Sequence, residues 1–109
     1  MIERGNLHDQ VSIPAQGETI GVLARLGGTV IEHIVSSASL VPVDQLQDHD
    51  EWVVVLDGVA TLDVDGEPVE LAAGDWLLIP AHTRHRVLTT TAGTRWLAVH
   101  GSPLTRGVQ

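Results

Sequence analysis

Turn signals recur about every eight to twelve residues along this chain, and short runs rich in Val, Ile, Leu and Thr lie between them. No long run repeats its apolar residues at the 3.6-residue period of a helix. This pattern is typical of an all-β sandwich or barrel and argues against a helical domain. The length of 109 residues suits a single domain.

The strongest turn signal is the pair Asp65-Gly66, which separates two runs of alternating apolar and polar residues. An Asp-Gly pair in this setting predicts a two-residue hairpin turn, because both turn positions need a positive φ. The alternation predicts that one face of the preceding run points to the core, namely Ala60, Leu62 and Val64. Pro68 is predicted at a strand start or on a sheet edge, since it has no N–H to donate.

Further strands are predicted on both sides of this hairpin. The complete set is 21–25, 29–36, 52–58, 59–64, 67–71, 76–79, 85–90 and 95–100. The run Trp76-Leu77-Leu78-Ile79 is apolar at every position, so we predict that it is buried on both faces.

Residues 1 to about 16 show no periodicity and are predicted to form an arm. We therefore divide the chain into an arm with the first strand, residues 1–25, and a barrel, residues 26–109. An open barrel leaves strand edges exposed, and the arm is available to cover one of them in a partner. We expect a homodimer with residues 1–25 at its interface.

Composition limits the partners and the chemistry. A net charge of −8 repels phosphate groups, so neither nucleic acid nor an anionic membrane surface is expected as a partner. Cys and Lys are both absent, which excludes thiolate and Schiff-base chemistry. Neither a membrane-spanning run nor a signal peptide is visible in the sequence, and we expect a cytoplasmic protein.

Two segments resemble the two sequence motifs of the cupin family. In the second motif Gly74, Pro80 and His85 fall in register, while His82 takes the position of a Gly and Thr89 that of an Asn. In the first motif Glu51 and Gly58 keep their spacing, whereas the two His positions fall on Gln45 and Gln47 and the leading Gly on Ser39. The resemblance covers about residues 30–100 and implies a double-stranded β-helix, or jelly-roll barrel.

The resemblance also implies a metal site inside the barrel. In metal-binding cupins two His and the Glu of the first motif converge with the His of the second. Carried over, this set becomes Gln45, Gln47, Glu51 and His85. An amide oxygen ligates a divalent cation more weakly than an imidazole does. A buried Glu51 also requires a partner of some kind, whether a metal ion, His85 or an Arg.

His49 supplies an imidazole near the two missing positions. In one interpretation a continuous strand places four alternating residues on one face, namely Gln45, Gln47, His49 and Glu51. His49 then joins Glu51 and His85 as a metal ligand. A set of two His and one carboxylate suits Fe, and also Mn, Zn or Ni, with Gln47 as the fourth ligand. In the other interpretation the chain bends before Glu51, and His49 is a solvated turn residue.

The remaining His and Arg residues are less constrained by the sequence. His82 is either a loop residue or an acid or base at the barrel mouth, and His100 has no predicted side. His8 and His33 are predicted at the surface. Arg84 and Arg86 flank His85 and are predicted to pair with surface carboxylates.

Two functions follow as hypotheses. The first is a metal-dependent oxygenase, isomerase or lyase that acts on a small organic molecule. The second is a barrel that binds or senses a metal or small ligand without turnover. The fold does not decide between them, since one barrel hosts many functions.

Overall fold

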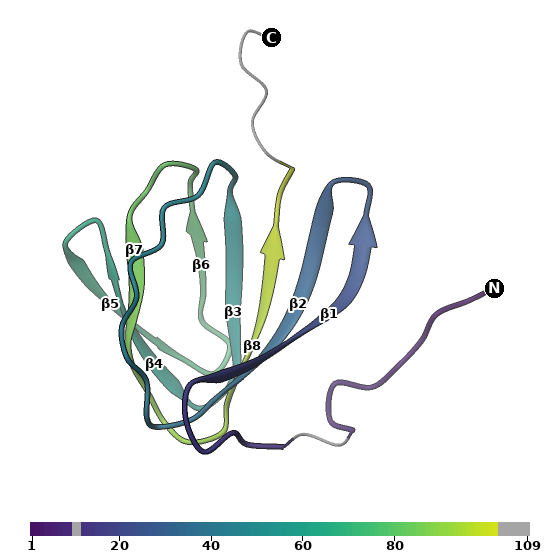
Figure 1. Cartoon of the computed structure of the whole chain (residues 1–109), viewed down its shortest axis with the longest axis horizontal. Helices are drawn as coiled ribbons and strands as arrows, with labels where there is room; N and C mark the ends of the chain where they lie inside the picture. Colours follow the sequence, from purple (N-terminus) through teal and green to yellow (C-terminus); the bar gives the residue numbers. More distant parts are fainter. Residues whose placement is uncertain (10–11, 103–109) are drawn as a thin grey trace, which may run out of the picture.

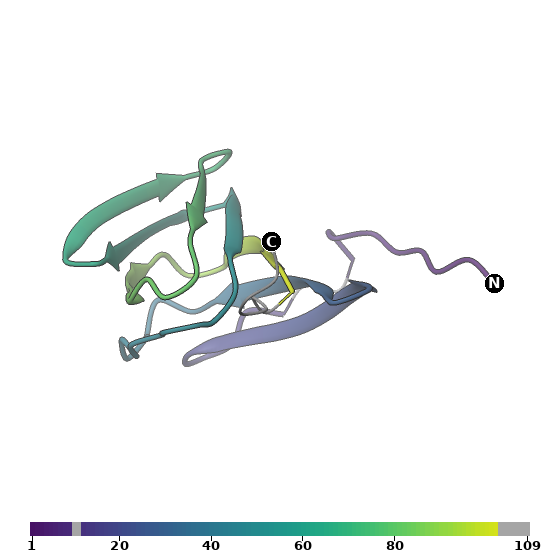
Figure 2. The ribbon, with the colours of Figure 1, turned by 90° about the horizontal axis from the view of Figure 1, so that it is seen from above.

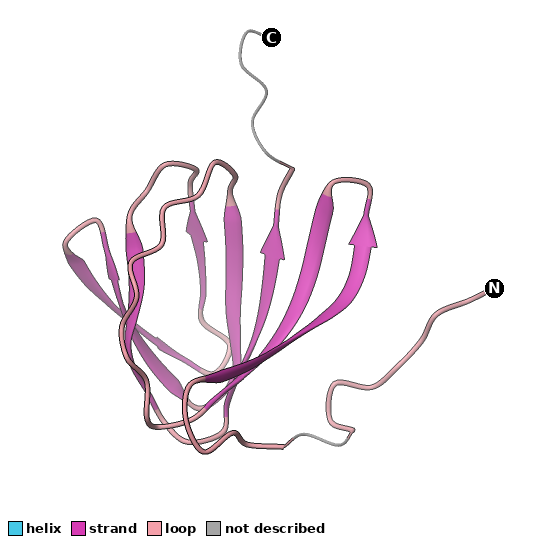
Figure 3. Ribbon diagram, in the orientation of Figure 1, coloured by secondary structure: helices cyan, strands magenta, loops and turns pink. Residues whose placement is uncertain are grey.

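The computed structural model describes residues 1–9 and 12–102, and in this part the chain is built of strands without any helix (Figure 3). The strands are β1 Glu18–Leu26, β2 Thr29–Ser36, β3 Glu51–Asp57, β4 Val59–Val64, β5 Glu67–Ala72, β6 Trp76–Ile79, β7 His85–Thr90 and β8 Thr94–His100. The predicted strands are confirmed, with β1 longer than the sequence indicated. No helix long and apolar enough to cross a membrane occurs among these residues.

The strands form two antiparallel sheets that face each other as a jelly-roll barrel (Figures 1 and 2). One sheet has the order β1-β2-β8-β3-β6, and the other has the order β5-β4-β7. The all-β jelly-roll prediction is therefore confirmed. Strand β1 pairs along its length with β2 and belongs to the larger sheet. The division of the chain after residue 25, and a role of that segment in a dimer, stay predictions.

The core lies between the sheets and is filled mainly by aliphatic side chains. Its buried members are Val53, Val55, Ala60, Leu62, Leu71, Ile79, Trp96 and Ala98. Alternation places these side chains on the inner faces of their strands. Ala60 and Leu62 are fully buried as predicted, and Val64 packs against the cluster.

The hairpin turn between β4 and β5 has the predicted geometry. Asp65 has a φ of 51° and Gly66 a φ of 86°. The Gly66 N–H donates to Oδ1 of Asp63 at 2.8 Å, which closes the turn. Pro68 lies near the start of β5, the edge strand of the smaller sheet, where its missing N–H breaks no ladder.

The prediction that strand β6 is buried on both faces is wrong. Trp76 is 61 % exposed and Leu78 is 52 % exposed, while Ile79 is fully buried. Strand β6 is the edge of the larger sheet and pairs with β3 alone, so its outer face has no covering layer in the described chain. Trp76 contacts Trp52 of β3 on that face, with ring centroids 6.1 Å apart.

Candidate functional site

The two cupin-like motifs meet inside the barrel at Glu51 and His85. Glu51 begins β3 and pairs with Ile79 on one side and His100 on the other. His85 begins β7 in the facing sheet. Its Nε2 lies 3.5 Å from Oε1 of Glu51, and the two residues are only 6 % and 9 % exposed. The structure therefore gives the buried carboxylate the partner that burial requires.

Local backbone features bring His85 to this position. Pro80 follows β6, and His82 has a φ of 63°, which turns the chain toward the smaller sheet. The backbone of His85 then exchanges hydrogen bonds with Gln45, with N···O distances of 2.8 and 3.0 Å. This bridge ties the segment before β3 to the start of β7, and it holds the two motifs together.

The pair is electrostatically stabilised as an ion pair. Burial by itself raises the pKa of Glu51, but the imidazoles of His85 and His100 and the amide of Gln47 together hold that pKa below its ordinary value. The Glu51 carboxylate raises the pKa of His85 against the opposing effect of burial, and the Thr83 carbonyl adds to the increase. A carboxylate and an imidazolium with pKa values moved apart form a candidate acid and base.

The orientation of the His85 ring is held by the backbone. Nδ1 lies 2.9 Å from the carbonyl oxygen of Thr83. Because a carbonyl oxygen only accepts, Nδ1 carries a proton and donates it. Nε2 is thereby the nitrogen that faces Glu51 and the interior, and it exchanges its proton there.

The Glu51–His85 pair lies in the wall of a cavity of about 450 Å³. Its apolar lining comes from both sheets and from residues 40–43, which lie between Ser39 and Gln45 of the first motif. The polar residues of the lining are Glu18, Glu32, Gln45, Gln47, Glu51, His85, Arg86 and His100. A mostly apolar cavity with a few convergent polar groups is the usual form of a small-molecule site.

The predicted site residues are only partly brought together. Gln47 is half-buried and lines the cavity beside Glu51 and His85. His49 does not join them, because residues 46–50 form a bent loop and β3 begins only at Glu51. The Nε2 of His49 instead lies 3.0 Å from Nδ1 of His100.

Sequence reasoning missed two residues of this site, His100 and Glu32. His100 lines the cavity, and its Nε2 lies 2.8 Å from Oε1 of Glu32 on β2. The sequence of β8 indicated the side on which His100 lies. His100 is two and four residues from the buried Ala98 and Trp96, so its side chain points to the same face of the strand. Nothing comparable marked Glu32, whose position beside His100 depends on the pairing of β2 with β8.

The donor set only partly fits the metal that the cupin resemblance implies. In residues 1–9 and 12–102 no group of three or more His, Asp or Glu side chains is placed to hold a metal ion. Glu51 and His85 supply two strong donors, and Gln45 and Gln47 line the cavity at the motif positions where the resemblance implies two imidazoles. An amide oxygen is a weaker ligand than an imidazole.

The other predicted positions have mixed outcomes. Arg84 and Arg86 pair with Asp44 at 3.8 and 3.9 Å, as expected, although Arg86 also lines the cavity. His8 and His82 are exposed. His33 is half-buried, contrary to expectation, because Nε of Arg95 contacts its ring at 3.4 Å and covers it.

Comparisons with known proteins agree with this architecture. The cupin domain family matches residues 38–100. A candidate mannose-6-phosphate isomerase from Ralstonia eutropha JMP134 is 38 % identical, with 93 % of this chain and 99 % of that chain covered and a TM-score of 0.83. No curated protein matches the chain.

More distant structures share the fold alone. A protein of unknown function from Streptococcus pyogenes is 20 % identical over 96 % of this chain and 91 % of its own, with a TM-score of 0.79. KdgF from a Halomonas species is 20 % identical over 83 % of this chain and 82 % of its own, with a TM-score of 0.73.

Proposed function

Because the chain belongs to the cupin domain family, we propose that its barrel binds a small hydroxylated carbonyl compound and isomerises it by proton transfer. The observation that carries this proposal is the buried Glu51–His85 pair in the wall of the cavity, with its two polar atoms 3.5 Å apart. Carboxylate and imidazole are the groups best suited to move protons near neutral pH.

The two residues have complementary roles in such a reaction. The lowered pKa keeps Glu51 ionised, so its carboxylate accepts the proton of the C–H next to the carbonyl group. The raised pKa keeps His85 protonated, so Nε2–H donates to the carbonyl oxygen. The product is a neutral enediol. Nε2 of His85 then takes the proton of the other enediol hydroxyl, while the Glu51 carboxyl protonates the carbon that carried the first carbonyl group. The new carbonyl group forms on the neighbouring carbon, and both residues return to their starting protonation states.

The charge of the cavity narrows the substrate class. The described lining holds three carboxylates, against which stand the guanidinium of Arg86 and the protonated imidazole of His85. The carboxylates are Glu18, Glu32 and Glu51. An excess of negative charge repels a phosphorylated compound and favours a neutral one. The 38 % identical relative is named for an isomerisation, which supports the reaction class, but its phosphorylated substrate is not carried over.

The test is solvent exchange at the carbon next to the carbonyl group. Untagged protein is incubated in D₂O with a panel of unphosphorylated aldoses, ketoses and hydroxyaldehydes, and deuterium incorporation is followed by NMR. We expect exchange with at least one compound, and a loss of about a hundredfold or more in Glu51→Gln and His85→Gln. The exposed His82→Gln is the matched control and should exchange normally. Equal exchange in Glu51→Gln would contradict the proposal.

A second candidate function is a divalent-metal barrel, with Fe, Mn, Zn or Ni held by Glu51, His85 and Gln47. The observation that favours it is the ring orientation of His85, since Nδ1–H donates to the Thr83 carbonyl and the neutral ring then presents the Nε2 lone pair to the interior. Metal analysis of untagged protein tests this candidate. We expect the metal to disappear in the double variant Glu51→Ala with His85→Ala. A wild-type content below about a tenth of an equivalent contradicts the candidate.

A further inference from the structure

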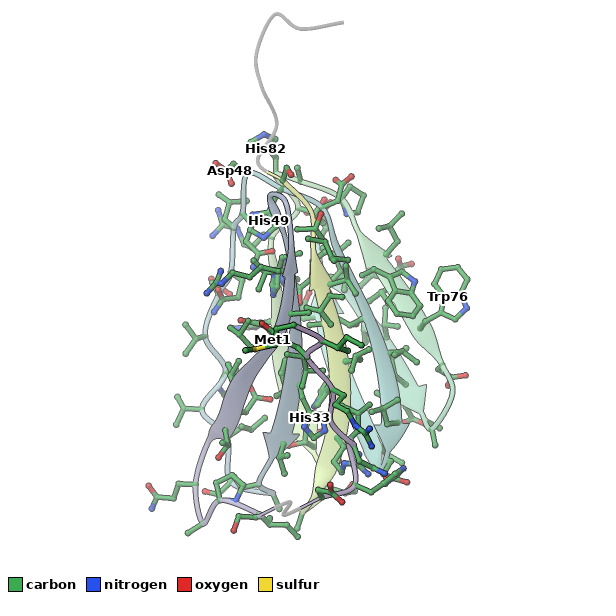
Figure 4. All side chains as sticks on the ribbon, turned by 90° about the vertical axis from the view of Figure 1, so that its right-hand side faces the viewer. Met1, His33, Asp48, His49, Trp76 and His82 are labelled. Atoms are coloured by element: carbon green, nitrogen blue, oxygen red, sulfur yellow. The ribbon has the colours of Figure 1, made fainter. Side chains whose placement is uncertain are left out.

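A covered arginine on the outer face of the larger sheet contacts the N-terminal arm. Arg95 lies on β8 next to Trp96, whose side chain belongs to the core, so alternation turns the Arg95 side chain outward. That side chain is nevertheless only 9 % exposed. Figure 4 shows the arm crossing in front of the sheet near His33. The arm and the neighbouring strands therefore cover a charge that would otherwise face water.

All three nitrogens of the guanidinium have acceptors. Nη1 of Arg95 lies 2.7 Å from Oδ2 of Asp57 and 3.1 Å from Nδ1 of His8. Nη2 donates to the carbonyl oxygen of Leu7 at 2.9 Å, and Nε donates to Nε2 of His33 at 3.4 Å. Two of these acceptors belong to the arm, and the other two belong to strands β2 and β3. Arg95 thus joins the arm to the sheet.

The arm has local structure that suits this contact. The backbone N–H of His8 donates to Oδ1 of Asn6 at 2.8 Å, and the N–H of Asp9 donates to the Asn6 carbonyl oxygen at 3.1 Å. These bonds form a turn that holds the carbonyl and the ring contacted by the guanidinium. The chain touches the barrel again at Gly93, between β7 and β8, where an added Cβ would lie 2.9 Å from Cδ1 of Ile13.

Both imidazoles at this contact must be neutral. A guanidinium only donates hydrogen bonds and keeps its charge at any ordinary pH. Nδ1 of His8 and Nε2 of His33 therefore present lone pairs to Arg95. Protonation of either ring removes a lone pair and brings a second positive charge against the guanidinium. Among the described residues that contact Arg95, only Asp57 has a carboxylate to offset such charges.

The electrostatics at His33 have the same direction. Burial lowers the pKa of His33, and the nearby charges of Arg95 and His8 lower it further. The contribution of the neutral ring is therefore complete above the ordinary imidazole pKa of 6.5 and is lost as pH falls through the lowered value.

We propose that Arg95, His8 and His33 form a pH-sensitive clasp that docks the N-terminal arm at neutral pH and releases it in acid. Asp57 keeps the guanidinium paired when the arm leaves, so the barrel itself stays folded. The clasp lies on the outer face of the sheet and is independent of the acid–base pair inside the barrel.

The test is backbone mobility of the arm, measured by ¹⁵N NMR relaxation on the untagged full-length protein. At about pH 7.5 we expect order parameters near 0.85 for residues 5–9, and at about pH 5 we expect values below about 0.6. The buried Val55 on β3 should stay rigid at both pH values, which shows that the barrel is intact. Equal order in residues 5–9 at the two pH values would overturn the clasp.

The ring signals of the same wild-type sample provide a second measurement. The pH at which the arm becomes mobile should coincide with protonation of His8 or His33, followed through their ring nitrogens. Release of the arm while both rings stay neutral would also overturn the clasp.

A double variant separates titration from hydrogen bonding. In His8→Asn with His33→Gln, an amide oxygen replaces each accepting ring nitrogen and does not titrate. The arm of this variant should stay ordered at both pH values. The control His82→Gln removes an exposed imidazole from the loop between β6 and β7 and should keep the wild-type pH response. An arm of the double variant that is still released in acid would assign the response to another group.

Discussion

At the scale of single residues, Glu51 and His85 illustrate how burial and pairing oppose each other. Burial alone disfavours both charged forms, yet the pKa of Glu51 is lowered and the pKa of His85 is raised. For Glu51 the imidazoles of His85 and His100 and the amide of Gln47 together outweigh desolvation. For His85 the Glu51 carboxylate and the Thr83 carbonyl do so. The resemblance to the two cupin motifs was enough to predict that these residues matter, because Glu51 and His85 keep their places in those motifs.

These opposite pKa shifts predict a stability window. The contribution of Glu51 is present above the ordinary carboxyl pKa of 4.5 and is lost as pH falls through its lowered value. The contribution of His85 is complete below the ordinary imidazole pKa of 6.5 and is lost as pH rises through its raised value. The Glu51–His85 pair should therefore stabilise the barrel most between pH 4.5 and pH 6.5, the ordinary pKa values of the two groups.

Urea unfolding of wild-type protein and of His85→Gln across the pH range measures this effect. The difference in unfolding free energy should be largest inside the window and should shrink on either side. Glu70→Gln, an exposed carboxylate on β5, is the control and should give a small difference with no such maximum. A difference for His85→Gln that does not vary with pH would count against the ion pair.

At the scale of elements, the β4–β5 hairpin depends on two residues with positive φ. Gly66 has a φ of 86°, and a Cβ added there meets nothing within 4 Å. Any cost of a substitution therefore comes from the backbone conformation and not from a clash.

Gly66→Val should lower the free energy of unfolding by about 1–2 kcal/mol, because a β-branched residue disfavours this left-handed conformation. Thermal unfolding followed by circular dichroism should show a decrease of roughly 4–8 °C for each kcal/mol lost. Gly66→Asn is the matched control, since Asn tolerates positive φ, and it should lose less. An unchanged midpoint in Gly66→Val would mean that the turn does not constrain the barrel.

At the scale of the whole molecule, two edges of the larger sheet carry exposed apolar side chains. On β1 these are Ile20, Val22, Leu23 and Leu26, and on β6 they are Trp76 and Leu78. An unpaired strand edge beside apolar surface favours association with another chain. Figure 4 shows Trp76 projecting away from the barrel.

We expect a homodimer whose interface includes β1, and light scattering coupled to size-exclusion chromatography measures it. Leu23→Glu should convert the dimer to a monomer, because it places a charge among exposed apolar side chains of β1. Thr89→Glu, an exposed position on β7 in the smaller sheet, should leave the dimer intact. A wild-type monomer at all concentrations would refute the expectation.

Features that depend on neighbouring residues follow from the amino-acid sequence alone. Alternation and turn chemistry located the strands, the Asp65-Gly66 turn and the buried face of β4, since these depend on backbone preferences over a few positions. The resemblance to the cupin motifs singled out Glu51 and His85, which begin β3 and β7.

The way in which distant segments meet depends on strand order and loop direction in the folded chain. His49 turns from Glu51 to His100 because the loop before β3 bends, and Glu32 reaches His100 because β2 pairs with β8. Trp76 is exposed because β6 is an edge strand. Strand order and loop direction depend on contacts between residues far apart in the chain, and local periodicity carries no information about those contacts.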